Sequence, residues 1–425
     1  MHRDNLARVA GAFLAIAAVS RAAAEDWPRF RGPDGRGIAA SAVPWRWGDG
    51  TNVRWRTPLP GAGSSSPIVH GDRVYVTAWS GGQEKGALVR HLLAVDRADG
   101  RIAWQRDIAA TGTDDAYQGY LTEHGYASST PVTDGRTVVA HFGKGGVVAW
   151  DRDGTELWRA DVGQESSNRR WGSAASPVIV GELVIVSAAE ESQSLRAFEL
   201  RTGKPVWKAE ASALELAYGT PVAVTLDDGT VELVLAVPEE VWGLDPATGK
   251  TRWYATTALT GNVSPSVVVD GTTLYVFGGF RSAGAVALRA GGRGDVSKTH
   301  VLWTSRSSSY VATPVLHDGH LYWIDDRGQA HCIQARDGRA VYRERVEGLA
   351  GGGGRPVYAS PVVSDGRIIV VSRWGGTFVL PAEPRFEILA HNVFADDDSD
   401  SSATPAIADG ALFLRSGRFL TCIGH

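Results

Sequence analysis

Sulfur-containing residues are scarce in this chain of 425 residues, which has one Met and two Cys. With so few cysteines, neither a disulfide framework nor a cysteine-rich metal site can organise the fold, and no Cys-x-x-Cys-His haem motif occurs. Positive charge is also in deficit, because 43 Lys and Arg stand against 47 Asp and Glu. A mildly acidic chain lacks the basic surface that attracts nucleic acid, so we expect no nucleic-acid partner.

The first residues contain an apolar run from Val9 to Val19, followed by Ala22 and Ala24 in the A-x-A spacing. This pattern predicts a secretory signal peptide over residues 1–24. The run is about half of the roughly 20 residues that a spanning helix needs, although a retained anchor is the alternative. No cysteine ends the run as a lipid acceptor. We therefore expect a periplasmic or secreted protein with no transmembrane segment after cleavage.

Glycine and tryptophan are abundant, with 51 and 15 copies. Many glycines supply tight turns, and many aromatic rings fill the spaces between strands. The composition is therefore typical of a turn-rich all-β protein.

A repeat organises the rest of the chain. Its modules open on Ser-Pro or Thr-Pro and mostly recur with a period in the mid-forties, which is typical of four-stranded propeller blades. The intervals between the opening prolines are 64, 46, 44, 44, 49, 47 and 44 residues. The opening prolines are Pro67, Pro131, Pro177, Pro221, Pro265, Pro314, Pro361 and Pro405.

Within a module, as in Ser176 to Trp207, an Asp-Gly-like turn closes a first hairpin and a Gly-containing turn precedes a fourth strand that carries an aromatic residue. Tyr342 takes the aromatic position once, and the module after Pro361 has PRFEIL there. The tryptophans in this position are Trp55, Trp104, Trp158, Trp207, Trp253 and Trp303.

The two chain ends complete one blade. The last module stops at its third strand, LTCIGH, and an orphan fourth strand, NVRWRTPL, precedes the first module. Pairing these strands closes a ring and removes exposed sheet edges. The sequence therefore predicts an all-β, eight-bladed β-propeller of four-stranded antiparallel blades over residues 51–425. Cys332 and Cys422 fall in third strands two modules apart, so we expect them not to pair.

Two segments depart from the repeat. Residues 25–50 have no strand or helix period but contain four bulky aromatics, so we expect an extended N-terminal arm that packs across the domain, or alternatively a ligand-binding flap. The first interval of 64 residues carries an insertion, IAATGTDDAYQGYLTEHGYAS, between a fourth strand and the next first strand. Loops of this kind open onto the face of a propeller where ligands and partners dock.

The repeats LRAFELRTGKPVWK and VWGLDPATGKTRWY resemble the pyrroloquinoline-quinone-type repeat of quinoprotein alcohol dehydrogenases. They also resemble the propeller of the lipoprotein subunit of the bacterial β-barrel assembly machinery. The resemblance implies that the repeated tryptophans dock between neighbouring blades. It implies a scaffold role or, through the dehydrogenases, the cofactor pyrroloquinoline quinone with calcium. This chain lacks the adjacent cysteine pair of those enzymes, and no residue matches their calcium ligands or general base. We therefore expect no cofactor.

A group of aromatic residues just before the first strands is the candidate site. Residues that enter the innermost strands ring the channel mouth, where they can grip a flat ligand or a peptide or else pack the neck of the channel. The candidate residues are Tyr126, Trp171, Tyr218, Tyr310 and Tyr358, with His124 and Arg170 close in sequence.

Asp396, Asp398 and Asp400 have the spacing of a calcium loop. The twelfth position is Ile407 rather than Glu, and no glycine occupies the sixth, so a solvated acidic loop is favoured.

We expect a non-catalytic, monomeric scaffold that binds protein or an envelope polymer through its rim loops, with outer-membrane protein assembly as one setting. The alternative is a quinone-dependent dehydrogenase-like or other small-ligand-binding enzyme that uses the channel mouth.

Overall fold

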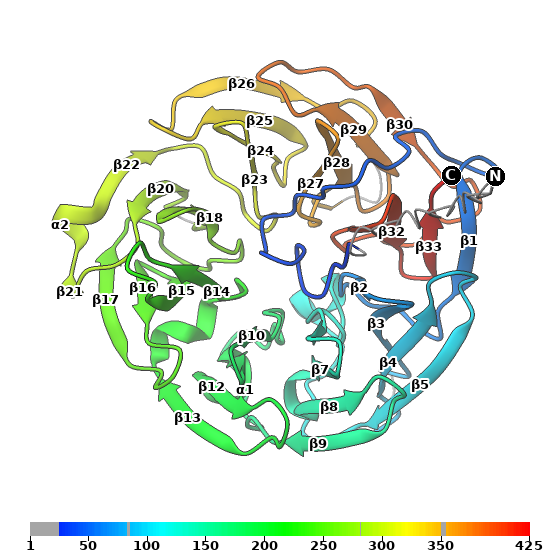
Figure 1. The fold of residues 1–425 in the computed structure, drawn as a ribbon, viewed down its shortest axis with the longest axis horizontal. Coiled ribbons are helices and arrows are strands. Elements are labelled where there is room, and N and C mark those ends of the chain that lie inside the picture. Colours follow the sequence, from blue (N-terminus) through cyan, green and yellow to red (C-terminus); the bar gives the residue numbers. More distant parts are fainter. Residues whose placement is uncertain (1–24, 83–85, 281, 350–353) are drawn as a thin grey trace, which may run out of the picture.

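The computed structural model describes residues 25–82, 86–280, 282–349 and 354–425, so the predicted signal peptide lies outside the described residues. Eight sheets stand around a central axis (Figure 1). Each contains four antiparallel strands that follow one another from the axis to the rim, with one extra strand in a single blade. The predicted eight-bladed propeller is confirmed.

The first, innermost strands follow the Ser/Thr-Pro openings. They are β2 (Ile68–His70), β6 (Val132–Thr133), β10 (Val178–Val180), β14 (Val222–Thr225), β18 (Val268–Asp270), β23 (Val315–His317), β27 (Val362–Ser364) and β31 (Ala406–Ala408).

The second and third strands form the middle of each blade. The second strands are β3 (Arg73–Ser80), β7 (Thr137–His141), β11 (Leu183–Ala188), β15 (Val231–Val237), β19 (Thr273–Gly278), β24 (His320–Ile324), β28 (Arg367–Val371) and β32 (Ala411–Arg415). The third strands are β4 (Val89–Asp96), β8 (Val147–Asp151), β12 (Ser194–Glu199), β16 (Glu240–Leu244), β20 (Gly284–Arg289), β25 (Gln329–Gln334), β29 (Thr377–Pro381) and β33 (Phe419–Ile423).

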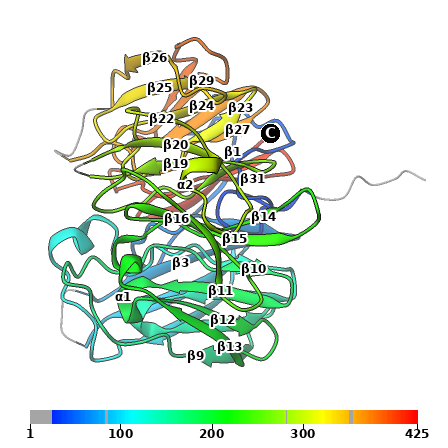
Figure 2. The same cartoon turned by 90° about the vertical axis from the view of Figure 1, so that its left-hand side faces the viewer.

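The fourth strands form the rim, which Figure 2 shows from the side with β9 and β13 at its edge. They are β5 (Ile102–Ala109), β9 (Glu156–Ala160), β13 (Pro205–Glu210), β17 (Thr251–Thr256), β22 (Val301–Ser305), β26 (Ala340–Arg345), β30 (Ala390–Asn392) and β1 (Val53–Pro58). The short helices are η1 (Gly119–Glu123), η2 (Gly143–Gly145), α1 (Ala189–Ser192), η3 (Ser212–Leu216) and α2 (Ser297–His300). No helix in the described ranges is long and apolar enough to cross a membrane.

The core consists of apolar layers between adjacent blades. One layer joins Leu92 of blade 1 to Val148 of blade 2, and another joins Phe277 of blade 5 to Trp323 of blade 6. Second and third strands are buried on both faces because each blade is covered by two neighbours, so these strands show continuous apolar runs. The ring is thus held by contacts between blades.

The ring closes as predicted, because β1 pairs antiparallel with β33 and Trp55 lies opposite Cys422. Cys332 and Cys422 are both buried and unpaired. The chain ends therefore share blade 8.

The repeated tryptophans dock across the seams between blades. The Trp158 indole donates a hydrogen bond of 2.9 Å to the carbonyl of Leu200 in the next blade. Its ring lies against Gly203, where an added Cβ would meet it at 2.5 Å. Because Gly203 also has a φ of +70°, the turn needs glycine for two reasons. Equivalent bonds are donated by Trp55 to Arg97, Trp104 to Arg152, Trp207 to Pro246 and Trp303 to Ala335.

Trp253 is the exception only in its hydrogen bond, because its ring is fully buried in the apolar layer between blades 4 and 5. Its indole donates to Glu232 of its own blade at 2.7 Å and lies over Gly243, where an added Cβ would meet the ring at 2.1 Å. Most other blades have alanine opposite the tryptophan, as Ala197 lies opposite Trp207. The rim of this blade is covered by a fifth strand, β21 (Gly294–Asp295), which pairs parallel with β17.

Two module boundaries differ from the sequence prediction. In blade 5, β18 begins at Val268, so Val267 stands where the other modules have proline, and Pro265 lies two residues early. Counting from Val267 makes the flanking intervals 46 and 47 residues. In blade 7 the fourth strand is β30, just after PRFEIL.

The N-terminal arm crosses the centre of the disc (dark blue in Figure 1). Isolated bridges join Trp27 to Val69 of blade 1 and Ile38 to Val363 of blade 7. Trp27 is fully buried. The insertion lies on the opposite face from the arm (cyan and dark blue in Figure 2), so the two departures from the repeat cover opposite ends of the channel.

Candidate functional site at the channel axis

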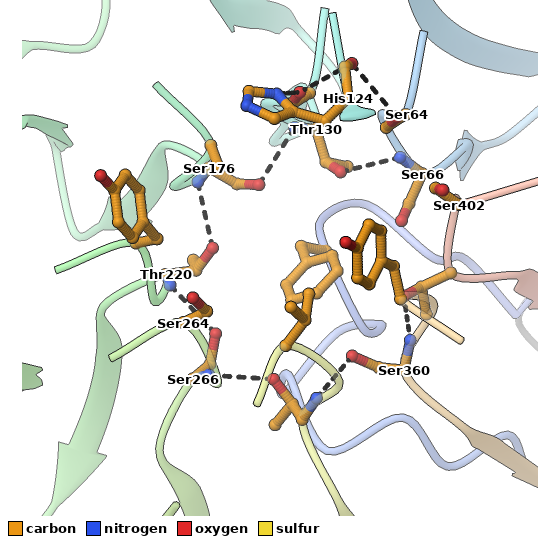
Figure 3. A pocket seen from close by; sticks show the side chains of 18 of the residues that line it. Ser64, Ser66, His124, Thr130, Ser176, Thr220, Ser264, Ser266, Ser360 and Ser402 are labelled. Carbon is orange, nitrogen blue, oxygen red and sulfur yellow. Dashed lines mark hydrogen bonds between the residues drawn. The ribbon is translucent and has the colours of Figure 1, made fainter. Parts of the chain in front are cut away.

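A ring of side-chain hydroxyls lines the channel where the chain enters the innermost strands (Figure 3). In each bond the backbone N–H of one blade donates to a Ser or Thr hydroxyl of the next, at 2.9–3.0 Å. The bonds run from Ser66 to Thr130, Ser176, Thr220, Ser266, Thr313, Ser360 and Thr404 in turn. The repeated Ser/Thr therefore links neighbouring blades at the axis.

The seam between blades 8 and 1 has a different link. Arg415 Nη1 donates to the carbonyl oxygen of Ser65 at 3.0 Å and to its hydroxyl at 2.9 Å. Burial lowers the pKa of Arg415 to about 9. A buried guanidinium thus ties the last blade to the first.

The arm provides the floor of the cavity at the axis. Phe30 lines the cavity, and the neighbouring Arg31 donates to the carbonyl of Pro314 at 2.8 Å. Burial lowers the pKa of Arg31 to about 9. Because Arg31 is buried and bonded to blade 6, it fixes the arm beneath the channel.

The insertion provides the roof. The Tyr120 hydroxyl donates to the Tyr358 hydroxyl at 3.1 Å, and the Tyr120 ring lies 4.7 Å from that of Trp171. These contacts leave a cavity of about 150 Å³ between the aromatic roof and Phe30. Its wall consists of hydroxyl, amide and aromatic side chains.

Ion pairs hold the insertion on the disc. Arg90 of β4 pairs with Asp114, and Lys144 of η2 lies 3.0 Å from Asp115. On the far side of the axis, Arg373 lies 2.6 Å from Glu123. The roof is therefore anchored to blades 1, 2 and 7.

The structure brings together four of the seven candidate residues. Trp171, Tyr218, Tyr358 and His124 line the cavity. His124 is held by the Ser128 hydroxyl at 2.5 Å and the Trp171 carbonyl at 2.7 Å, and burial lowers its pKa. This histidine therefore serves to position the roof.

The other three candidates lie elsewhere. Tyr126 packs edge-on against Trp79, with ring centroids 5.2 Å apart, and its hydroxyl donates to the Asp115 carbonyl. Tyr310 packs against Phe280 and lines a groove between blades 5 and 6. Arg170 is exposed on a loop with a φ of +52°.

Sequence reasoning missed Tyr120, Phe30 and the hydroxyl ring. The Ser/Thr before each proline was a visible signal, but it was used only to mark modules. Tyr120 and Phe30 lie in segments without a repeat, so no periodicity points to them.

Tyr218 connects the cavity to a buried carboxyl group. Its hydroxyl donates to Glu190 at 2.9 Å, and Ser167 N–H also donates to Glu190 at 3.3 Å. Burial raises the pKa of Glu190 to about 7. Burial also raises the pKa of Tyr218, so this hydroxyl remains a donor.

The acidic loop before Pro405 is occupied by ion pairs. Each carboxylate pairs with a different arginine: Asp396 with Arg56, Asp398 with Arg418 and Asp400 with Arg373. In the described part of the chain, no group of three or more His, Cys, Asp or Glu is placed to hold a metal ion.

The cavity does not fit pyrroloquinoline quinone. This cofactor carries carboxylates that need cationic partners, yet none of the described residues that line the cavity is Lys or Arg. Tyr120 and Tyr358 also bond to each other across its roof. The lining suits an uncharged occupant instead.

The closed ring, the seam tryptophans and the hydroxyl ring define a β-propeller built from pyrroloquinoline-quinone-type repeats. The chain belongs to the family described as "Outer membrane protein assembly factor BamB", whose model matches residues 47–116, 90–344 and 295–383.

Curated relatives with that name include the Yersinia pestis protein, 25% identical over 324 residues that span 74% of this chain and 70% of the relative. The Escherichia coli K12 protein is 25% identical over 339 residues, covering 76% of this chain and 73% of the relative.

Among solved structures, BamB from Moraxella catarrhalis has a TM-score of 0.60 at 16% identity, covering 87% of this chain and 98% of that one. A europium-containing methanol dehydrogenase has a TM-score of 0.63 at 13% identity, covering 93% of this chain and 90% of that one. At these identities the likeness concerns the fold alone.

Proposed function

We propose that this chain is a non-catalytic periplasmic scaffold in outer-membrane protein assembly, which binds a protein partner through loops on the face that carries the insertion. The observation that carries the proposal is that the family model matches residues 47–383. The closed ring of blades supports it. The names of the curated relatives supply the setting. We expect the chain to act as a monomer, which light scattering of the purified protein checks.

The build of the axis supports a scaffold. The hydroxyls of the ring accept hydrogen bonds from backbone N–H groups of neighbouring blades, so they hold the disc together. The imidazole of His124 is bonded through both nitrogens. A rigid disc presents its loops in a fixed arrangement, which lowers the entropy lost on binding.

The test is the assembly of outer-membrane proteins in the native host. Deletion of the chain should lower the amount of folded porin in the outer membrane, and a tagged copy should crosslink to proteins of the assembly machinery. A control pull-down with purified envelope polymer separates protein from polymer binding. Normal porin levels together with no crosslinked assembly protein would refute the proposal.

A second candidate function is the binding of a small uncharged ligand at the axis, which the cavity of about 150 Å³ favours. The hydroxyl groups of its wall can still donate hydrogen bonds to a ligand, and Trp171 and Tyr218 offer aromatic faces on which a ligand can stack. A screen of neutral sugars and aromatic compounds by thermal shift tests it, with Trp171→Ala as the variant that should lose the shift.

A further inference from the structure

A second concave site lies away from the axis, between blades 5 and 6. This groove of about 520 Å³ is bounded by Gly279, Phe280 and Ala283 after β19, by the loop after β22 and by the turn between β24 and β25. Such connections between second and third strands, and from one blade to the next, lie on the same face as the insertion, because the strands of a blade alternate in direction. The groove therefore opens on the face that we propose for partner binding.

An exposed aromatic residue stands at one end of the groove. Phe280 is 57% exposed, more than any other large hydrophobic residue in the described ranges. Its ring lies 5.8 Å from that of Tyr310, which is itself buried. Exposing a phenylalanine side chain to water is unfavourable, and covering it with a partner contributes strongly to the free energy of binding. Phe280 is therefore suited to anchor an apolar side chain of a partner.

The charged lining is predominantly basic. Its arginines are Arg306, Arg327, Arg343 and Arg355. Both aspartates of the lining have partners, since Asp326 lies 3.1 Å from Arg355 and Asp325 lies 2.9 Å from His331. Arg306 and Arg327 form no ion pair with any residue that the structure describes. A chain with a net charge of −4 thus concentrates positive charge in this groove.

The base of the groove is held firmly. Trp323 stacks on His331 with ring centroids 4.6 Å apart, and its indole donates to the Ser308 carbonyl at 3.0 Å. The Arg355 guanidinium lies 4.3 Å from the Tyr310 ring centre. Because these groups are fixed before binding, a partner loses little entropy in ordering them.

We infer that this groove binds an acidic, extended segment of a protein partner, with an aromatic or aliphatic side chain of that segment against Phe280. The inference rests on the proposed function only for the partner being a protein. Arginines recognise carboxylates through paired N–H donors, and the adjacent apolar contact distinguishes a peptide from a uniformly charged polymer. Steering by the basic lining should make association sensitive to salt.

The inference is tested with the purified mature chain and a fluorescein-labelled peptide of Glu and Asp with one central Phe. Fluorescence anisotropy measures the affinity. Arg306→Glu combined with Arg327→Glu should weaken binding by roughly a hundredfold, and Phe280→Ser by roughly tenfold. A peptide with Ala in place of Phe should bind the wild type about as weakly as the original peptide binds the Phe280→Ser variant.

Arg289→Glu combined with Arg293→Glu is the matched control. It changes the net charge by the same amount in blade 5, one of the two blades that form the groove, but lies outside the groove, so affinity should stay within about twofold. Melting curves establish that each variant is folded. Equal losses from the groove and control variants, or no binding of the peptide by the wild type, would overturn the inference. A heparin probe that binds as tightly as the peptide would instead indicate an anionic polymer and overturn it too.

Failure of this inference is distinguishable from failure of the proposed function. If the groove variants assemble porins normally while deletion of the chain lowers porin levels, the scaffold role stands and this groove is not its contact surface.

Discussion

The cavity at the axis and the groove between blades 5 and 6 are both concave, but they use polar groups in opposite ways. At the axis, Ser and Thr hydroxyls accept hydrogen bonds from neighbouring blades, and the described lining contains no charged Lys, Arg, Asp or Glu. In the groove, Arg306 and Arg327 stand without ion pairs among the described residues beside an exposed Phe280. Repeated residues therefore hold the ring together, whereas residues that occur once are available for recognition.

The largest expected effect is the loss of a seam tryptophan. Trp158→Ala removes a side chain that is 8% exposed together with its bond to Leu200, so the free energy of unfolding should fall by about 3–5 kcal/mol. Urea unfolding followed by tryptophan fluorescence measures this loss. The adjacent Leu157→Ala is the control, because Leu157 is 45% exposed and its truncation should cost less than about 0.5 kcal/mol. Similar losses in both variants would show that the seams do not hold the ring.

The next effect depends on pH. Because burial raises the pKa of Glu190 to about 7 from an ordinary 4.5, the folded chain binds a proton there that the unfolded chain releases. The contribution of Glu190 to the free energy of unfolding is fully present below pH 4.5. It is lost as the pH rises towards 7, which lowers the free energy of unfolding by at most roughly 3 kcal/mol.

Glu190→Gln should flatten this part of the profile of unfolding free energy against pH. The exposed Glu165→Gln is the control and should leave the profile unchanged. A wild-type stability that rises between pH 4.5 and 7, with the rise abolished in Glu190→Gln, would contradict a raised pKa at Glu190.

A smaller effect is expected in the hydroxyl ring. Thr220→Val keeps the shape of the side chain but leaves the Ser176 N–H without its acceptor, which should cost about 1–2 kcal/mol. Thr220→Ser retains the acceptor and should cost less than Thr220→Val. Thermal unfolding of the pair checks this order, and equal losses would mean that the ring hydrogen bonds contribute little.

The smallest effect on stability is expected in the groove. Arg306→Glu with Arg327→Glu should change the free energy of unfolding by less than about 0.5 kcal/mol, because both side chains are exposed. A loss of unfolding free energy comparable to that of Trp158→Ala would show that the groove arginines stabilise the fold. The contrast between the two sites would then not hold.

The fold was predictable because its signals repeat. Ser/Thr-Pro correctly marked the start of seven of the eight innermost strands. The closure of the ring could be predicted because the N-terminal strand with Trp55 supplies the fourth strand that the last module lacks. In blade 5, Pro265 placed the start of the innermost strand two residues too early. A second hydroxyl residue, Ser266, follows it, and the side chain of Ser266 is the one that belongs to the hydroxyl ring. The hydrogen bond of Trp253 could not be predicted, since its acceptor is the carboxylate of Glu232 in its own blade and not a carbonyl of the next blade.

The candidate sites were less predictable. Trp171, Tyr218 and Tyr358 could be found because they precede the innermost strands, but Tyr120 reaches Tyr358 from 238 residues away. The groove joins Phe280 and Arg327, which belong to different blades and carry no motif. Proximity that arises only when blades pack leaves no periodic signal in a single sequence.

The most direct test of the central claim, that recognition lies in the groove and not at the axis, is site-specific photocrosslinking in living cells. A photoreactive amino acid is placed at Phe280 in one variant and at Tyr120 in another. We expect a crosslink to an outer-membrane assembly protein from position 280 and none from position 120. A protein crosslink from position 120 with none from position 280 would contradict the claim.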